Sequence, residues 1–224
     1  MSPDPVRPAR GRRPLVHRGQ ELRCSWRFEE EARSEGRLRV AGCDEVGRGA
    51  LCGPVVAGAV ILGDGFDPDG LDDSKRLTER QREKLAERIR TRAQAWALGC
   101  VEPPEIDRIN ILRATHLAMR RAVEALSEAP DLLLVDALSV PGLTLVQRAI
   151  VKGDARCYSI AAASIVAKVA RDAMMRLCDE RYPGYGLARN MGYASEDHRE
   201  AIRRMGPSEI HRRSFHGTQR WLFS

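Results

Sequence analysis

The sequence contains no long hydrophobic run, no secretory signal and no paired cysteine motif. No apolar stretch is long enough to span a membrane, and the first residues lack the hydrophobic segment of a signal peptide, so we expect neither a membrane-spanning nor a secreted protein. The six cysteines are scattered, with no CxxC pair and no spacing typical of a zinc site. We therefore expect reduced, mostly buried thiols in a cytoplasmic protein that has no membrane partner.

Charge is distributed unevenly along the 224 residues. Lys and Arg number 37 against 31 Asp and Glu, a formal net charge of +6, and many of the arginines lie in the first 40 residues and after residue 199. Such an excess points to a polyanionic partner. Residues 1–20 are rich in Arg, Pro and Gly, which predicts a basic, disordered arm. The length suits one domain, which we place at residues 21–217, followed by a tail at 218–224.

The pattern of apolar residues predicts an α/β domain with a mixed sheet. Residues 131–136 contain a short continuous apolar run, typical of a strand that is buried on both faces. Residues 159–178 are apolar on nearly all sides in their first half, which predicts a helix in the core. Strands and helices that alternate in this way form an α/β fold. The expected strands are 38–44, 55–62, 93–101, 131–136 and 149–152, and the expected helices are 21–32, 78–92, 105–126, 159–178 and 195–205.

The most informative segment is Asp44-Glu45-Val46-Gly47-Arg48-Gly49, followed by Gly53-Pro54. It joins two predicted strands and places two adjacent acids before an arginine that lies between glycines. Neighbouring side chains of a strand point to opposite faces, so both acids can serve one site only where the strand becomes irregular. The glycines predict that irregularity, and their exposed backbone can approach a phosphate or a sugar closely.

Acids also follow two later strands, as Asp136 and Asp154. Strand ends that lie together at one edge of an α/β sheet form its binding site. Four carboxylates there would repel one another unless divalent cations lay between them, and oxygen ligands alone favour Mg²⁺ or Mn²⁺ over zinc. A single acid after a strand is common in ordinary turns, but all four together predict a metal site. Two ions would activate a water on one side of a phosphorus and stabilise the leaving oxygen on the other.

Six motifs in the chain share their order with a known family. They are Asp44 to Gly49 with Gly53-Pro54, Asp72-Asp73-Ser74-Lys75, Val135-Asp136, Lys152-Gly153-Asp154-Ala155, Ile160 to Asp172, and His211-Arg212-Arg213-Ser214-Phe215. Together they closely resemble bacterial ribonuclease HII, of the type 2 ribonuclease H family. The resemblance covers nearly the whole chain, and several of the motifs are long, so their joint occurrence is highly specific.

The resemblance implies a ribonuclease H-like fold, with a mixed five-stranded sheet, flanking helices and a helical C-terminal region. It implies an endoribonuclease that cuts the phosphodiester 5′ of a ribonucleotide, in RNA–DNA hybrids or embedded in duplex DNA, and leaves 3′-hydroxyl and 5′-phosphate ends. By position, Asp44, Glu45, Asp136 and Asp154 are then the catalytic acids that bind Mg²⁺ or Mn²⁺. We expect a monomer.

The same resemblance implies a set of substrate contacts. Gly47, Arg48 and Gly49 match the residues that read the ribose 2′-hydroxyl, the group that distinguishes RNA from DNA. Tyr193 matches the tyrosine that packs on the deoxyribose after the ribonucleotide. The residues expected to bind substrate, mostly at its phosphates, are Ser74, Lys75, Lys152, Arg212, Arg213 and Ser214.

The sequence around Tyr193 departs from the family pattern. The family usually has His-Lys-Gly-Tyr-Gly-Thr, and this chain has Asn190-Met191-Gly192-Tyr193-Ala194-Ser195. A basic residue is lost at Met191, so we expect weaker phosphate affinity at this point.

Residues 219–223, Gln-Arg-Trp-Leu-Phe, resemble the short peptides that bind the bacterial sliding clamp. This resemblance makes the clamp a candidate partner. The alternative is that Trp221 and Phe223 fold back onto the domain, because matches over five residues arise easily.

The residues leave two other functions open. The first is a four-acid 3′–5′ exonuclease, but such enzymes begin with Asp-x-Glu on one strand face, whereas Asp44 and Glu45 are adjacent. The second is a non-catalytic basic module that binds nucleic acid, which would explain the net charge but not the central acids. His198, His211 and His216 have no zinc-like spacing and are expected to be surface or structural residues.

Overall fold

The structure is a computed structural model that describes residues 22–218. The predicted arm at 1–20 and the candidate clamp-binding residues 219–223 lie outside the described residues. The strands are β1 (Val40–Val46), β2 (Val55–Ile61), β3 (Ala95–Val101), β4 (Leu132–Asp136) and β5 (Gln147–Ile150). The helices are α1 (Arg27–Ser34), α2 (Glu79–Arg92), α3 (Pro103–Ile109), α4 (Ile111–Glu124), η1 (Gly153–Ala155), α5 (Tyr158–Arg181), α6 (Leu187–Asn190) and α7 (Glu196–Met205).

The five strands form one mixed sheet in the order β3-β2-β1-β4-β5. β2 pairs antiparallel with β1 and with β3, whereas β4 pairs parallel with β1 and with β5. The predicted mixed five-stranded sheet is therefore confirmed. Because β1 and β4 run parallel side by side, their carboxyl ends lie at the same edge of the sheet, and both ends carry acids.

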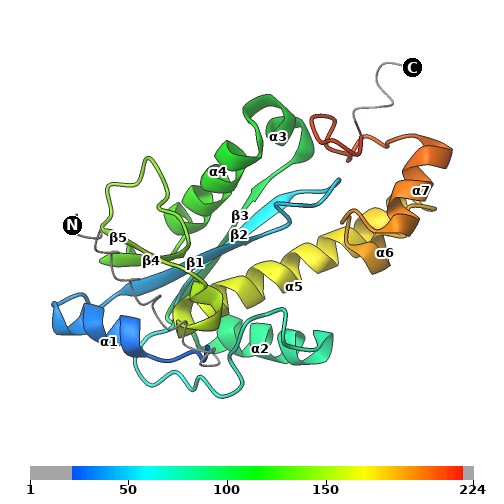
Figure 1. The fold of residues 1–224 in the computed structure, drawn as a ribbon. Helices are drawn as coiled ribbons and strands as arrows, with labels where there is room; N and C mark the ends of the chain where they lie inside the picture. Colours follow the sequence, from blue (N-terminus) through cyan, green and yellow to red (C-terminus); the bar gives the residue numbers. More distant parts are fainter. Residues whose placement is uncertain (1–21, 219–224) are drawn as a thin grey trace, which may run out of the picture.

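Helices cover both faces of the sheet (Figure 1). α4 packs over β2 and β3 on one face, and α5 crosses β1 and β2 on the other face with α2 beside it. The side chains of β1 alternate between the two cores, with Ala41 and Cys43 in the core against α4 and Val40 in the core against α5. None of the described helices is long and apolar enough to cross a membrane.

Two glycines allow α5 to lie directly on the sheet. A Cβ atom at Gly42 of β1 would lie 2.1 Å from the carbonyl carbon of Ser159, and one at Gly58 of β2 would lie 2.4 Å from the carbonyl oxygen of Ala163. No side chain fits at either position, because the atoms it would meet belong to the helix backbone. This close contact fixes α5 over the carboxyl end of β1, where the helix presents Ser164, Lys168 and Arg171.

Several element boundaries differ from the sequence prediction. β1 continues to Val46, so Asp44 and Glu45 lie inside the strand and the irregular backbone begins only after them. β5 ends at Ile150, and Lys152 follows in a left-handed conformation with φ +55°. The predicted single helix at 105–126 is two helices, because Asn110 adopts φ +69° and its side chain accepts the N–H of Arg113 to cap α4. The single-turn helix α6 has no counterpart among the predicted elements.

Candidate active site

A cavity of about 480 Å³ lies at the edge of the sheet where β1 and β4 end. Acids from both strands, the glycine-flanked backbone after β1, side chains of α5 and a tyrosine from the C-terminal region converge on it. The lining residues are Asp44, Glu45, Val46, Gly47, Arg48, Gly49, Ser74, Lys75, Asp136, Ser164, Lys168 and Tyr193. Five segments that are distant in the sequence therefore meet in one place.

Asp44 is the most deeply buried acid of the cavity wall, with 5% of the residue exposed. Its carboxylate accepts the backbone N–H of Glu45 at 2.8 Å and the hydroxyl of Ser164 on α5. The Ser164 hydroxyl lies 3.0 Å from that of Ser74, so a short chain of polar groups supports the carboxylate. Burial, together with the charge of Glu45, nevertheless raises the pKa of Asp44 well above its usual value.

Glu45 and Asp136 complete the acid wall. Glu45 points to the opposite side of β1 from Asp44, yet both line the cavity, because it opens at the end of the strand. Arg48 lies 3.9 Å from the Glu45 carboxylate. Asp136 accepts the backbone N–H of Gly153 at 2.7 Å. Burial raises the pKa of both Glu45 and Asp136, and the charge of Asp136 raises that of Glu45 further.

Asp154 is buried behind this wall and does not line the cavity itself. Its carboxylate accepts the ammonium group of Lys75 at 2.8 Å, and Lys75 also lies 3.7 Å from Asp73. Burial alone would lower the pKa of Lys75, but the hydrogen bond and charge of Asp154 raise it above its usual value. Lys75 thus links the fourth predicted acid to the cavity, and its ammonium group shows that the carboxylates attract a cation.

The donor set fits a hard divalent cation. The predicted acids offer only carboxylate oxygens, the ligands that Mg²⁺ and Mn²⁺ prefer. The raised pKa values of Asp44, Glu45 and Asp136 also mean that the folded chain holds their negative charges at a cost, which a bound cation would offset. These acids, with Asp154, are the residues that could hold such an ion.

The backbone after β1 forms the opposite rim of the cavity. Gly47 is buried with φ +88°, a conformation that a residue with a side chain rarely adopts, whereas Arg48 and Gly49 are exposed. The segment is tied to the C-terminal region, because the N–H of Leu51 donates to the carbonyl of Gly192 at 2.8 Å. Tyr193, the next residue, lies with its ring 5.4 Å from the guanidinium of Arg171 and 5.9 Å from the ammonium of Lys168.

The remaining predicted substrate contacts are placed differently. Lys152, Arg213 and Ser214 are exposed but do not line the cavity, and Asp107 accepts the backbone N–H groups of Arg213 and Ser214 at 2.9 Å each. Arg212 is fully buried, and its guanidinium donates to the carbonyls of Gly53 and Arg48. The structure therefore assigns Arg212 to the support of the glycine segment, not to a surface that a phosphate can reach.

Sequence reasoning missed three residues on α5. Ser164, Lys168 and Arg171 face the cavity or its rim, although the sequence indicates Ser164 only as part of the core helix, and Lys168 and Arg171 only as side chains of that helix that reach the surface or pair with acids. Lys168 donates to Asp172 at 2.8 Å, which agrees with the expected ion pair on this helix. Their spacing of three to four residues is the signal that places them on one helix face.

The histidines form a structural pair. His198 donates from Nδ1 to the carbonyl of Tyr193 at 2.8 Å, and His211 accepts the N–H of Ser208 at Nδ1. Each ring is thereby fixed in one neutral tautomer, with Nε2–H of His211 pointing to Nε2 of His198 at 3.2 Å. Burial lowers the pKa of both rings, that of His211 to about 4. Cys52 lies beside the pair, but the hydrogen bonds already use both imidazoles, and buried Arg171 and Arg212 nearby oppose a further cation.

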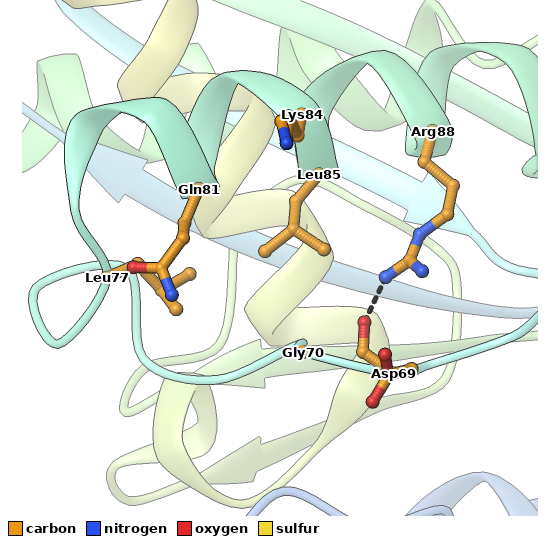
Figure 2. Close-up of a pocket in the computed structure, with 7 residues that line it drawn as sticks. All are labelled: Asp69, Gly70, Leu77, Gln81, Lys84, Leu85 and Arg88. Carbon is orange, nitrogen blue, oxygen red and sulfur yellow. Dashed lines mark hydrogen bonds between the residues drawn. The ribbon is translucent and has the colours of Figure 1, made fainter.

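A second cavity, of about 340 Å³, lies between α2 and the loop before it (Figure 2). Leu77 and Leu85 form its apolar walls, and Arg88 donates to the carbonyl oxygen of Asp69 across it. Asp69 is the one acid that lines it, so this cavity does not offer the converging carboxylates of the first.

Comparison with known proteins agrees with the geometry. The family described as ribonuclease HII matches residues 41–218. Ribonuclease HII of Desulfitobacterium hafniense strain Y51 is 53% identical over 196 residues, which cover 88% of this chain and 75% of that protein. Among solved structures, ribonuclease H2 of Pyrococcus horikoshii OT3 matches with a TM-score of 0.67 and 29% identity, over 81% of this chain and 96% of the other.

A third relative was solved with a partner. The structure of a complex between PCNA and ribonuclease HII from Archaeoglobus fulgidus matches with a TM-score of 0.64 and 26% identity, over 80% of this chain and 95% of the other. These structures confirm the predicted ribonuclease H-like fold. The chain belongs to the ribonuclease HII family and is a nuclease of the ribonuclease H type.

Proposed function

We propose that the chain is a metal-dependent endoribonuclease that cuts the phosphodiester 5′ of a ribonucleotide, in RNA–DNA hybrids and in duplex DNA that contains single ribonucleotides. One observation carries the proposal: a single cavity joins Asp44, Glu45 and Asp136 to the Gly47–Gly49 backbone and to Tyr193. Acids for hydrolysis, a backbone that can approach a sugar, and an aromatic ring for the next sugar thus line the same cavity. The products have 3′-hydroxyl and 5′-phosphate ends.

The acids provide the hydrolytic half of the site. Asp44, Glu45, Asp136 and Asp154 would hold two Mg²⁺ or Mn²⁺ ions, which when bound activate a water and stabilise the leaving oxygen. Ser164 keeps the Asp44 carboxylate in place, and the N–H of Gly153 keeps that of Asp136. Lys75 donates to Asp154 at 2.8 Å, and with a metal ion held by Asp154 its ammonium group would be available to a substrate phosphate.

The rim of the cavity provides the recognition half. The backbone at Gly47 to Gly49 donates to the 2′-hydroxyl, which only the ribonucleotide carries. The Tyr193 ring packs against the sugar that follows, where a 2′-hydroxyl would collide with it. The lost basic residue at Met191 leaves Lys168 as the ammonium group nearest this ring in the cavity wall.

A duplex DNA with one internal ribonucleotide tests the proposal. In the presence of Mg²⁺ we expect a single cut on the 5′ side of that residue, and no cut when EDTA removes the metal or when a deoxyribonucleotide replaces the ribonucleotide. Denaturing gels of end-labelled strands measure the position of the cut. Progressive shortening from a strand end would instead identify an exonuclease and contradict the proposal.

We further propose that residues 219–223 bind a sliding clamp. Two facts support this: the Gln-Arg-Trp-Leu-Phe sequence resembles clamp-binding peptides, and a relative of the same fold was solved in complex with PCNA. Thr218, the last described residue, is held in place because its hydroxyl donates to the carbonyl of Phe215. Truncation after Thr218 should abolish clamp binding in surface plasmon resonance while cleavage of a short duplex is retained, and equal binding by both chains would exclude the idea.

A further inference from the structure

Arg171 is a buried side chain that contacts both halves of the recognition rim. The residue has 0% exposure and lies on α5, one turn after Lys168. Its Nε donates to the carbonyl of Pro54 at 2.9 Å and its Nη2 to that of Cys52 at 3.2 Å, both at the end of the glycine segment. Its Nη1 donates to the carbonyl of Met191 at 2.9 Å, two residues before Tyr193.

The same guanidinium packs directly against the two recognition elements. A Cβ atom at Gly47 would lie 2.0 Å from Nε of Arg171, so the side chain lies in contact with the backbone of the glycine. On its other side the guanidinium carbon lies 5.4 Å from the centre of the Tyr193 ring. Arg171 is thus the common neighbour of the residue that meets the ribose and the residue that meets the next sugar.

Burying the charge of an arginine in this space costs free energy. Burial lowers the pKa of Arg171 below its usual value, which shows that the surroundings disfavour its charge. Apolar residues of similar volume often replace buried charges without loss of stability. Apolar residues cannot supply a planar guanidinium whose N–H groups donate to three carbonyls in fixed directions, and a lysine cannot supply one either. The presence of an arginine here therefore indicates that these three carbonyls must be held in fixed positions.

We propose that Arg171 is a positioning residue that fixes the separation between Gly47 and Tyr193, and so sets the preference for a ribonucleotide followed by a deoxyribonucleotide. The inference rests on the proposed function. It assigns a specificity role to a side chain that the substrate does not touch. When the guanidinium is lost, the backbone at Gly47 and the backbone that carries Tyr193 move independently. The site then no longer contacts the two neighbouring sugars at a fixed separation.

The test compares two substrates on the same preparation of Arg171→Lys. One is duplex DNA with a single ribonucleotide, and the other is a uniform RNA–DNA hybrid, in which a ribose follows every cut. We expect the kcat/KM for the single-ribonucleotide duplex, divided by the kcat/KM for the uniform hybrid, to fall by about tenfold. Because one preparation gives both values, partial loss of folded enzyme cancels in the ratio. If Arg171→Lys does not fold, Arg171→Gln keeps one amide donor without a buried charge and is measured in the same way.

Two further variants separate positioning from general destabilisation. Glu29 is buried at the other end of α5, where it accepts the N–H of Ser159 at 2.8 Å, so Glu29→Gln should weaken the fold but leave the ratio unchanged. In Tyr193→Ala, adding Arg171→Lys should change the ratio by less than about twofold, because both act on the same step. An unchanged ratio in Arg171→Lys, or independent losses in the double variant, would overturn the proposal. A wild-type chain that cuts neither substrate would refute the proposed function instead.

Discussion

Replacing Asp44 by asparagine is expected to lower kcat by about 10³-fold or more and, at neutral pH, to stabilise the metal-free protein. The loss of activity follows because the amide cannot contribute a negative charge to a divalent ion, and such an ion would supply several kcal/mol of transition-state stabilisation. The gain in stability follows because burial beside Glu45 disfavours the charged carboxylate, so folding at neutral pH carries a cost that asparagine does not have. Asparagine keeps the shape, and its amide oxygen can still accept the Glu45 N–H, without the charge.

The pH dependence of this stability gain has a definite sign. The pKa of Asp44 is raised in the folded protein, so the folded state binds a proton more tightly than the unfolded chain does. Stability of the metal-free protein therefore falls as the pH rises from the ordinary value of 3.8 through the raised folded pKa. Asp44→Asn removes this dependence, so its advantage should be absent below pH 3.8 and should grow as the pH rises toward neutral.

Asp131 supplies a matched control with the opposite sign. It pairs with Arg39 at 2.7 Å, and this hydrogen bond lowers its pKa to about 2. Asp131→Asn should therefore lose stability at neutral pH, lose nothing near pH 2, and leave kcat unchanged because the residue is far from the cavity wall. Thermal unfolding midpoints in EDTA, measured from pH 2 to pH 8, and single-turnover rates in Mg²⁺ check both variants. Retention of more than a tenth of kcat in Asp44→Asn would remove this residue from the catalytic set.

The sequence predicts that three of the acids lie together, because their positions follow from the pattern of strands. Asp44, Glu45 and Asp136 lie where apolar runs end, and parallel pairing of β1 and β4 brings those ends together. Basic residues are harder to place, since a charge in a motif does not show whether it is exposed. Arg212 and Arg213 are neighbours in the sequence, yet the first is buried on backbone carbonyls and the second is exposed.

The point at which a helix is interrupted also depends on single residues, whose effect the hydrophobic periodicity does not show. The apolar periodicity of 105–126 is compatible with one helix, and only the conformation of Asn110 divides it. In the same way, the periodicity of α5 does not show which of its polar residues face the cavity. That depends on the distance from α5 to the sheet, which Gly42 and Gly58 determine from a different part of the chain.

Replacing Gly47 by alanine should lower kcat/KM on the single-ribonucleotide duplex by about 10²-fold, because misplacement of reacting groups by about 1 Å has effects of this size. Two obstacles act together at this position. The backbone has φ +88°, and the new Cβ atom would lie 2.0 Å from Nε and 2.8 Å from Cζ of Arg171. Either the glycine segment must move toward the substrate, or the guanidinium must leave the carbonyls of Cys52 and Pro54.

Gly65 separates the steric effect from backbone strain. It has φ +76°, similar to that of Gly47, but no atom lies within 4 Å of its Cβ position. Gly65→Ala should therefore lose about 1 kcal/mol of folding stability and no activity. If Gly47→Ala behaves like Gly65→Ala, the contact with Arg171 has no influence on the site. If only Gly47→Ala loses activity, a glycine is required at this position because the Arg171 side chain occupies the space where a Cβ atom would lie. The Gly47–Gly49 backbone then depends on its contact with Arg171 as much as on its own conformation.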